Sequence, residues 1–182
     1  MLALSLQRRR TQGAAGRAVA AFQELTKRPP YKWQERLLCR WFVEGRIPEA
    51  VDLPTGLGKT ATMALWLSAL SVGIKLPRRL IYVVDRRTVV DQASEEADRL
   101  AVVLGEADGD NSSINELRRG LGLKRRQPLP VSTLRGQHLD NRLWLEDPGA
   151  PAIIIGTVDM IGSRLLFEGY GVSPRMHPYM PG

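Results

Sequence analysis

The sequence predicts an α/β fold built on a parallel sheet that helices cover on both faces, a three-layer arrangement. Short apolar runs alternate along the chain with helical stretches, and the strongest runs are continuously apolar, as in strands buried on both faces. A glycine-rich turn also connects one apolar run to an apolar helix. With 182 residues, the chain has the size of one domain and can bury a core without disulfides.

The first part of the chain predicts two helices. Residues 1–14 show no apolar period, so we expect a loose start ahead of one domain over residues 15–182. Apolar residues three apart predict a helix over 16–26, which a Pro-Pro pair ends. A second helix is predicted over 31–43, and Gly45 closes it.

Strands and helices alternate in the rest of the chain. Apolar runs predict strands at 50–53, 80–84, 130–133 and 152–155. Helical spacing predicts helices at 59–71, 88–104 and 114–121, and a last helix that runs through residue 166. A polar loop is expected at 105–112, and the proline-containing end, 170–182, is expected to be coil.

Composition excludes several classes of protein. One cysteine and two histidines provide neither a disulfide framework nor a multi-cysteine zinc site. No apolar run approaches the ~18 residues of a membrane span, and the start lacks the charge order of a secretory signal, so we expect a cytoplasmic protein. The net charge of +7 and the recurring arginine clusters suit phosphate oxygens, which makes nucleic acid the first partner to test. An ordinary solvated surface is the alternative.

The most informative segment is the loop Asp-Leu-Pro-Thr-Gly-Leu-Gly-Lys-Thr at 52–60. Glycines let the backbone N–H groups approach phosphates closely, a lysine reaches the β and γ phosphates, and a threonine hydroxyl binds magnesium. We therefore predict an ATP and Mg²⁺ site, against the alternative of a glycine-rich turn without a ligand. The predicted nucleotide-binding residues of the loop are Thr55, Gly56, Leu57, Gly58, Lys59 and Thr60, of which Thr60 is the metal ligand.

These residues resemble the superfamily-two helicases. The segment 53–60 is similar to their motif I, although Leu53 stands where the pattern usually has its first glycine. Gln34, which lies 25 residues before Lys59, resembles the glutamine of the Q motif. The resemblance implies that Gln34 reads adenine through its paired donor and acceptor. Tyr31 or Trp33 could stack on the base, and a place in the core is the equal alternative for both. A polar residue on a helix surface is the alternative for Gln34.

Three later segments resemble the nucleic-acid motifs of the same family. Residues 85–92 are similar to motif Ia, residues 132–136 to motif Ib, and residues 156–160 to the motif that follows. The last of these contains a threonine that helix capping alone would also explain. The resemblance implies nucleic-acid contacts at Arg86, Arg87, Thr133, Arg135, Gly136 and Thr157.

More narrowly, the segments 85–92, 132–137 and 156–171 resemble the helicase component of type I CRISPR systems. That resemblance implies ATP-driven translocation on single-stranded DNA and recruitment by an RNA-guided surveillance complex. Nothing in the chain supports the HD nuclease that such proteins often carry. A DEAD-type RNA helicase, or a basic nucleic-acid-binding module that does not hydrolyse ATP, remains an alternative.

The chain contains no Asp-Glu strand of the Walker B type, which ATP hydrolysis needs to hold magnesium and activate water. In the family, this strand follows shortly after the point where the sequence ends. We therefore expect the first part of a RecA-like lobe that stops before Walker B, with no catalytic residue and with unpaired sheet edges that lower stability. A divergent ATP-binding protein that never hydrolyses ATP is the alternative.

Overall fold

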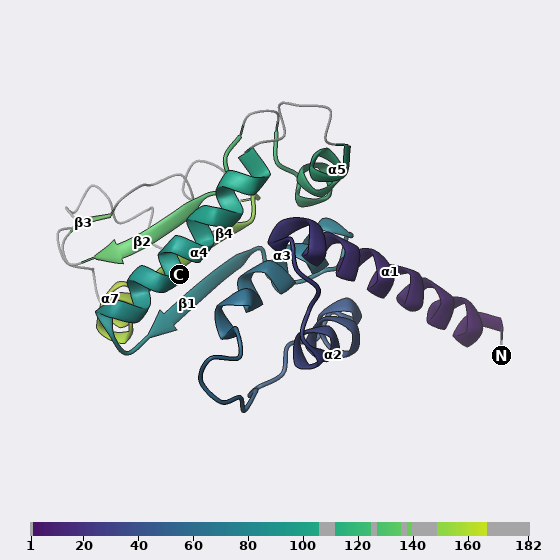
Figure 1. The fold of residues 1–182 in the computed structure, drawn as a ribbon, viewed down its shortest axis with the longest axis horizontal. Helices are drawn as coiled ribbons and strands as arrows, with labels where there is room; N and C mark the ends of the chain where they lie inside the picture. The colour runs from purple at the N-terminus through teal and green to yellow at the C-terminus, as the bar shows by residue number, and fades with distance from the viewer. Residues whose placement is uncertain (1, 106–111, 125–126, 136–137, 140–148, 167–182) are drawn as a thin grey trace. The chain divides into compact units, whose positions relative to one another are not determined.

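The computed structural model describes residues 2–105, 112–124, 127–135, 138–139 and 149–166 (Figure 1). The chain forms two compact units, which are described in turn. Met1–Pro77 and Val102–Pro128 make up the first unit, and Arg78–Ala101 and Leu129–Gly182 make up the second.

The first unit is helical and is built around one buried helix. Its elements are α1 (Leu2–Thr26), α2 (Lys32–Arg40), the 3₁₀ turns η1 (Phe42–Glu44) and η2 (Lys59–Ala61), α3 (Thr62–Ser71) and α5 (Ser112–Leu121). All residues from 63 to 70 of α3 are buried, and α1, α2 and α5 pack against this helix. A helix that is apolar on every side has to be surrounded in this way.

Helices α3 and α5 approach each other closely at Gly120. A Cβ atom built on Gly120 would lie 1.7 Å from the carbonyl oxygen of Ser71, the last residue of α3. No side chain fits such a gap, so glycine is needed here for its small size. The contact fixes where α5 crosses the end of α3.

A buried arginine connects several backbone segments of the same unit. Arg118 on α5 is 6% exposed, and its guanidinium donates hydrogen bonds to three backbone carbonyls. The acceptors are Leu104 at 2.8 Å, Lys124 at 2.7 Å and Gln127 at 3.0 Å. Leu104 lies in the last turn of α4 (Arg87–Gly105), where carbonyls lack helical partners and the helix dipole favours a cation. Arg118 therefore joins three segments through their backbone.

The second unit contains the sheet. Its strands are β1 (Arg79–Val84), β2 (Val131–Arg135), β3 (His138–Leu139) and β4 (Ala152–Thr157), in the order β1-β4-β2-β3. β4 pairs in parallel with both β1 and β2, and the short β3 pairs antiparallel with β2. Residues 152–156 of the central strand β4 are buried, as expected for a strand with neighbours on both sides.

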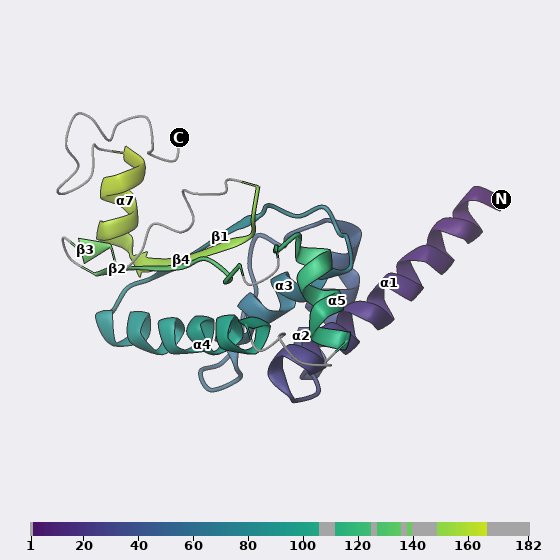
Figure 2. The same ribbon diagram turned by 90° about the horizontal axis from the view of Figure 1, so that it is seen from above.

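Helices α4 and α7 (Val158–Leu166) lie on opposite faces of this sheet (Figure 2). On the α7 face, Ile161 packs with Leu134 and Ile154. A Cβ atom on Gly156 would lie 3.2 Å from the Cβ of Leu134 and 3.3 Å from Ile161, so glycine lets α7 pack tightly there. The structure confirms the predicted α/β class and the parallel pairing of three strands.

Two local predictions are wrong. Residues 50–53 form no strand, because their side chains are exposed or half-exposed and no described strand lies beside them. The expected loose start over 1–14 is helical from Leu2, since α1 continues through Gly13 and Gly16. The sequence also gave no sign of β3, and the expected coil at 170–182 lies outside the described residues.

The remaining predicted elements are present, with bounds shifted by a few residues. The helix expected over 31–43 is divided into α2 and η1, and the helix expected over 59–71 begins with the 3₁₀ turn η2. Within the described part of the chain, no helix is both long enough and apolar enough to cross a membrane. The predicted boundary between an N-terminal segment, 1–14, and one domain, 15–182, stays a prediction.

Candidate functional site

The glycine-rich loop leads directly into η2 and α3, so the buried helix of the first unit supports it. Gly56 has φ +83° and Gly58 has φ +68°, a left-handed conformation that glycine adopts without strain. Within the described chain, the N–H groups of Gly56, Leu57 and Gly58 donate no hydrogen bond. Lys59 follows as an exposed side chain at the start of η2. The loop thus offers free donors beside one ammonium group.

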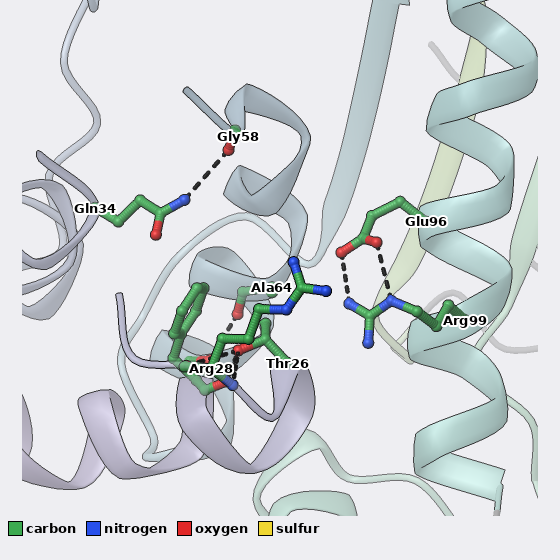
Figure 3. A network of polar contacts seen from close by, with 9 residues as sticks. Thr26, Arg28, Gln34, Gly58, Ala64, Glu96 and Arg99 are labelled. Carbon is green, nitrogen blue, oxygen red and sulfur yellow. Dashed lines mark hydrogen bonds and ion pairs between the residues drawn. The ribbon is translucent and has the colours of Figure 1, made fainter. Parts of the chain in front are cut away.

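Gln34 contacts this loop from the first turn of α2. Its Oε1 accepts a hydrogen bond from the N–H of Tyr31 at 2.8 Å. Its Nε2 donates one to the carbonyl of Gly58 at 3.2 Å (Figure 3). The side chain is 3% exposed, so the alternative of a surface residue is wrong. An amide group has two N–H donors and two acceptor lone pairs, which leaves Gln34 one N–H and one lone pair beyond these two bonds.

Two aromatic residues border the same loop. The indole Nε1 of Trp33 donates a hydrogen bond to the carbonyl of Leu57 at 3.0 Å. Tyr31 is 58% exposed, and its ring lies 3.5 Å from where a Cβ on Gly58 would be. The sequence predicts either base stacking or a place in the core for these residues, and the exposure of Tyr31 excludes the core for that residue. The sequence gives no sign of the hydrogen bond from Trp33 to Leu57. The position of Trp33 directly before the predicted Q-motif glutamine is the feature of the sequence that could have indicated this hydrogen bond.

A cavity of about 580 Å³ lies in the second unit, at the carboxyl ends of β1, β2 and β4. In open α/β sheets, this edge is where ligands bind. Polar lining comes from Asp85, Arg87, Asp91, Thr157 and Asp159, beside apolar residues such as Leu134. The predicted segments 85–92 and 156–160 therefore meet at one cavity. Its three carboxylates were not predicted as site residues.

The structure brings together only some of the predicted nucleic-acid contacts. Arg87 and Thr157 line the cavity, whereas Arg86 is exposed and its Nε lies 3.7 Å from Oδ2 of Asp85. Thr133 is 6% exposed, and its hydroxyl shares a hydrogen bond of 2.8 Å with that of Ser94 on α4. Thr133 therefore helps to join β2 to α4 and does not line the cavity.

Two further predicted contacts cannot be placed with the others. Arg135 ends β2, and its side chain lies outside the described part of the structure, as does all of Gly136. The resemblance to motif Ib therefore rests on the sequence alone.

Cys39 lies on α2, five residues after Gln34. Burial raises the pKa of its thiol, and the negative charge of Glu35 raises it further. A thiol whose pKa is raised is a poor nucleophile at neutral pH, so we assign no chemistry to Cys39. In the second unit, burial likewise raises the pKa of Tyr82 on β1.

The second unit has a parallel α/β sheet, and in the first unit a glycine-rich loop opens a helix with Lys-Thr. Both features agree with the class of P-loop nucleotide-binding proteins, although the described residues 50–53 before the loop do not form the expected strand. The chain belongs to the ResIII family (type III restriction enzyme, res subunit), whose model matches residues 7–160. This is a superfamily-two helicase-like family, so the predicted helicase superfamily is confirmed. No curated protein and no solved structure matches the chain.

Family membership makes the chain a helicase-like protein of the ATP-binding class, in agreement with the predicted loop. Helicases of this kind act on nucleic acid, which agrees with the class of partner that the charge predicts. The narrower resemblance to the CRISPR helicase stays a prediction.

Proposed function

We propose that this chain is the ATP-binding part of an ATP-dependent helicase or translocase that acts on nucleic acid. The observation that carries the proposal is the loop at 53–60, whose described N–H groups lack acceptors beside an exposed lysine. Donors arranged in this way on a glycine-rich turn suit the oxygens of a polyphosphate. Membership of the ResIII family supports the same activity.

The residues present fit ATP and Mg²⁺. The N–H groups around Gly56 and Gly58 would hold the phosphates, Lys59 would neutralise charge on the β and γ groups, and the half-exposed Thr60 would offer its hydroxyl to Mg²⁺. Thr55 and Leu57 would shape the same loop. Bound MgATP would supply the phosphoanhydride bond whose hydrolysis drives movement along a strand.

We propose that Gln34 recognises the adenine base. Its unused N–H and lone pair form a donor and an acceptor side by side, the pattern needed to pair with the edge of adenine. Because its other donor and acceptor bind Gly58 and Tyr31, the amide is already oriented before a nucleotide arrives.

Substitution of Lys59 by alanine tests ATP binding. Removing one charge-assisted contact to the phosphates is expected to weaken MgATP binding about 10- to 100-fold, as measured by titration calorimetry. Lys75→Ala is the matched control, because Lys75 is also an exposed lysine of the first unit but lies outside the loop. Equal ATP affinity of Lys59→Ala and the unsubstituted chain would contradict the proposal.

We further propose that single-stranded DNA binds at the carboxyl ends of β1, β2 and β4. Arg86, Arg87 and Thr157 at this edge supply cations and a hydroxyl for phosphate oxygens. We also propose contacts from Arg135, Gly136 and Thr133, in the segment that resembles motif Ib. For Thr133, the contact would require its hydroxyl to leave Ser94.

Binding of single strands at several salt concentrations tests this interface. Arg87→Ala should lower the slope of log affinity against log salt by about 0.7, the value for one phosphate contact on a single strand. Arg17→Ala, an exposed arginine on α1, should leave the slope unchanged. Tighter binding of RNA than of DNA at matched salt would favour the RNA-helicase alternative, and DNA binding without any ATP binding would favour a basic binding module.

The finer proposal is a DNA translocase of CRISPR defence in the cytoplasm, recruited by an RNA-guided surveillance complex. It is supported by the sequence of 85–92, 132–137 and 156–171, which resembles the CRISPR helicase. Copurification with an RNA-guided complex from the native source would support it, and copurification with a DNA methyltransferase instead would overturn it.

A further inference from the structure

Two neighbouring side chains in the first turn of α2 bind two consecutive carbonyls of the glycine-rich loop. Trp33 donates to the carbonyl of Leu57 at 3.0 Å, and Gln34 donates to that of Gly58 at 3.2 Å. The two donors lie 24 residues before their acceptors, so each bond connects α2 to the loop across a long stretch of chain. Both partners belong to the first unit.

These bonds determine where the loop's N–H groups point. In a trans peptide, the carbonyl oxygen and the following N–H lie on opposite sides of the same plane. Because the carbonyls of Leu57 and Gly58 face α2, the N–H groups of Gly58 and Lys59 face away from it. Helix α2 therefore orients two successive donors of the loop toward the side opposite itself.

The two contacts are not equivalent. The carbonyl of Gly58 also accepts a hydrogen bond from the N–H of Ala61 at 3.2 Å, so the start of the helix holds it as well. The carbonyl of Leu57 accepts from Trp33 alone within the described chain. The side chain of Leu57 is 38% exposed and provides little packing, and flexible glycines flank it on both sides. The orientation of this peptide thus depends on one indole N–H.

We propose that Trp33 is a positioning residue that presents the Gly58 N–H to the polyphosphate of a nucleotide, independently of the base. This inference rests on the proposed ATP binding and deepens it. In this role, the indole N–H of Trp33 acts on phosphate binding through the loop. In base stacking, by contrast, the flat face of the indole ring would contact the adenine.

The test compares phosphate binding with base recognition in the full chain. Trp33→Phe keeps an aromatic ring and removes the N–H. By titration calorimetry, its affinities for inorganic tripolyphosphate and for ATP should fall by the same factor, about fivefold to tenfold, the usual effect of one lost hydrogen bond. The ratio of ATP to GTP affinity should stay unchanged. The backbone amide resonance of Gly58 should also shift in the free protein.

Trp41→Phe is the matched control. Trp41 follows α2, is partly exposed and lies against Arg46, with 5.0 Å between the guanidinium carbon and the ring centroid. It has no hydrogen bond to the loop within the described chain, so its replacement should change neither tripolyphosphate nor ATP affinity. A decrease equal to that of Trp33→Phe would show a general effect of removing an indole and would overturn the proposal.

The failures of the two proposals can be distinguished. If the unsubstituted chain binds neither tripolyphosphate nor ATP, the proposed function fails and this inference fails with it. If the unsubstituted chain binds both and Trp33→Phe binds them equally well, only the role of Trp33 is overturned. A changed ATP to GTP ratio with unchanged tripolyphosphate affinity would assign Trp33 to base stacking instead.

If Trp33→Phe does not fold, 3-benzothienylalanine at position 33 provides the same test. This residue keeps the size of the double ring and replaces the N–H with sulfur. Weaker tripolyphosphate binding would support the proposal, and unchanged binding would overturn it.

Discussion

The side-chain nitrogen of Gln34 lies 3.2 Å from the carbonyl oxygen of Gly58 and joins the predicted base-reading residue to the predicted phosphate loop. The sequence indicates each residue separately, through two motifs 24 positions apart. Their direct contact means that a change at either residue affects both the loop and the amide.

Gly58→Ala is expected to weaken ATP binding at least about tenfold. The new Cβ would lie 3.3 Å from Nε2 of Gln34, and the φ of +68° would be strained for alanine by about 1 kcal/mol. Titration with ATP and a urea melt measure the two effects. Gly73→Ala is the control, because its φ is +84° and nothing lies within 4 Å of the new Cβ. It should lose similar stability and keep full ATP affinity. Equal ATP affinity of Gly58→Ala, Gly73→Ala and the unsubstituted chain would show that the loop tolerates a methyl group at position 58 and would contradict this prediction.

Gly120→Ala is expected to lower the free energy of unfolding by about 2–4 kcal/mol. Its Cβ would overlap the carbonyl oxygen of Ser71, so α5 would have to move away from α3. Urea denaturation followed by circular dichroism measures the loss. Gly16→Ala, in α1 with open space around the new Cβ, should instead stabilise the chain by about 0.5–1 kcal/mol. Equal midpoints for the two variants would contradict the close crossing of α3 and α5.

Arg118→Met is expected to destabilise the chain by about 2–3 kcal/mol. Methionine keeps much of the apolar stem but leaves the carbonyls of Leu104, Lys124 and Gln127 without their shared donor. The neighbouring Arg119 is exposed, so Arg119→Met should stay within about 0.5 kcal/mol of the unsubstituted chain. The comparison uses the same urea melts, and similar losses for both variants would mean that the three bonds contribute nothing specific.

Alkylation of Cys39 should have a midpoint above the ordinary thiol pKa of about 8.5. Burial is the larger cause and Glu35 the smaller, so Glu35→Gln should lower the midpoint only partway. Rates with iodoacetamide across pH 7 to 10 give the midpoint. Because the folded-state pKa is raised, the thiol has no effect on stability below the unfolded value and lowers stability as pH rises through the folded one. A midpoint at or below that of a free thiol would contradict the burial of Cys39.

Much of the fold was predictable because its signals are local. The apolar run that became β4 and the Lys-Thr helix start are visible within a few residues each, and both are present. The strand expected at 50–53 was wrong for the opposite reason. A strand needs partners, and an apolar run of four residues cannot reveal whether a neighbouring strand lies beside it.

The site was predictable in its residue types and less so in its contacts. Glycines with positive φ and an exposed lysine follow from the loop pattern itself. The bond from Trp33 to Leu57 and the burial of Thr133 against Ser94 depend on how distant segments pack, which residue spacing does not encode. The first part of α1, before the helix predicted from residue 16, was missed because two glycines obscure its period. Packing of α1 against α3 outweighs their low helix propensity.

The close approach of α5 to α3 at Gly120 also restricts how the helix that follows the phosphate loop can move. Helix α3 begins at the loop and ends at Ser71, where α5 leaves no space for even one methyl group. The helix therefore cannot slide along its own axis toward α5 when a ligand arrives. We therefore expect the loop to adjust in the glycine-flanked peptides ahead of Lys59, while Lys59 at the start of η2 keeps its position.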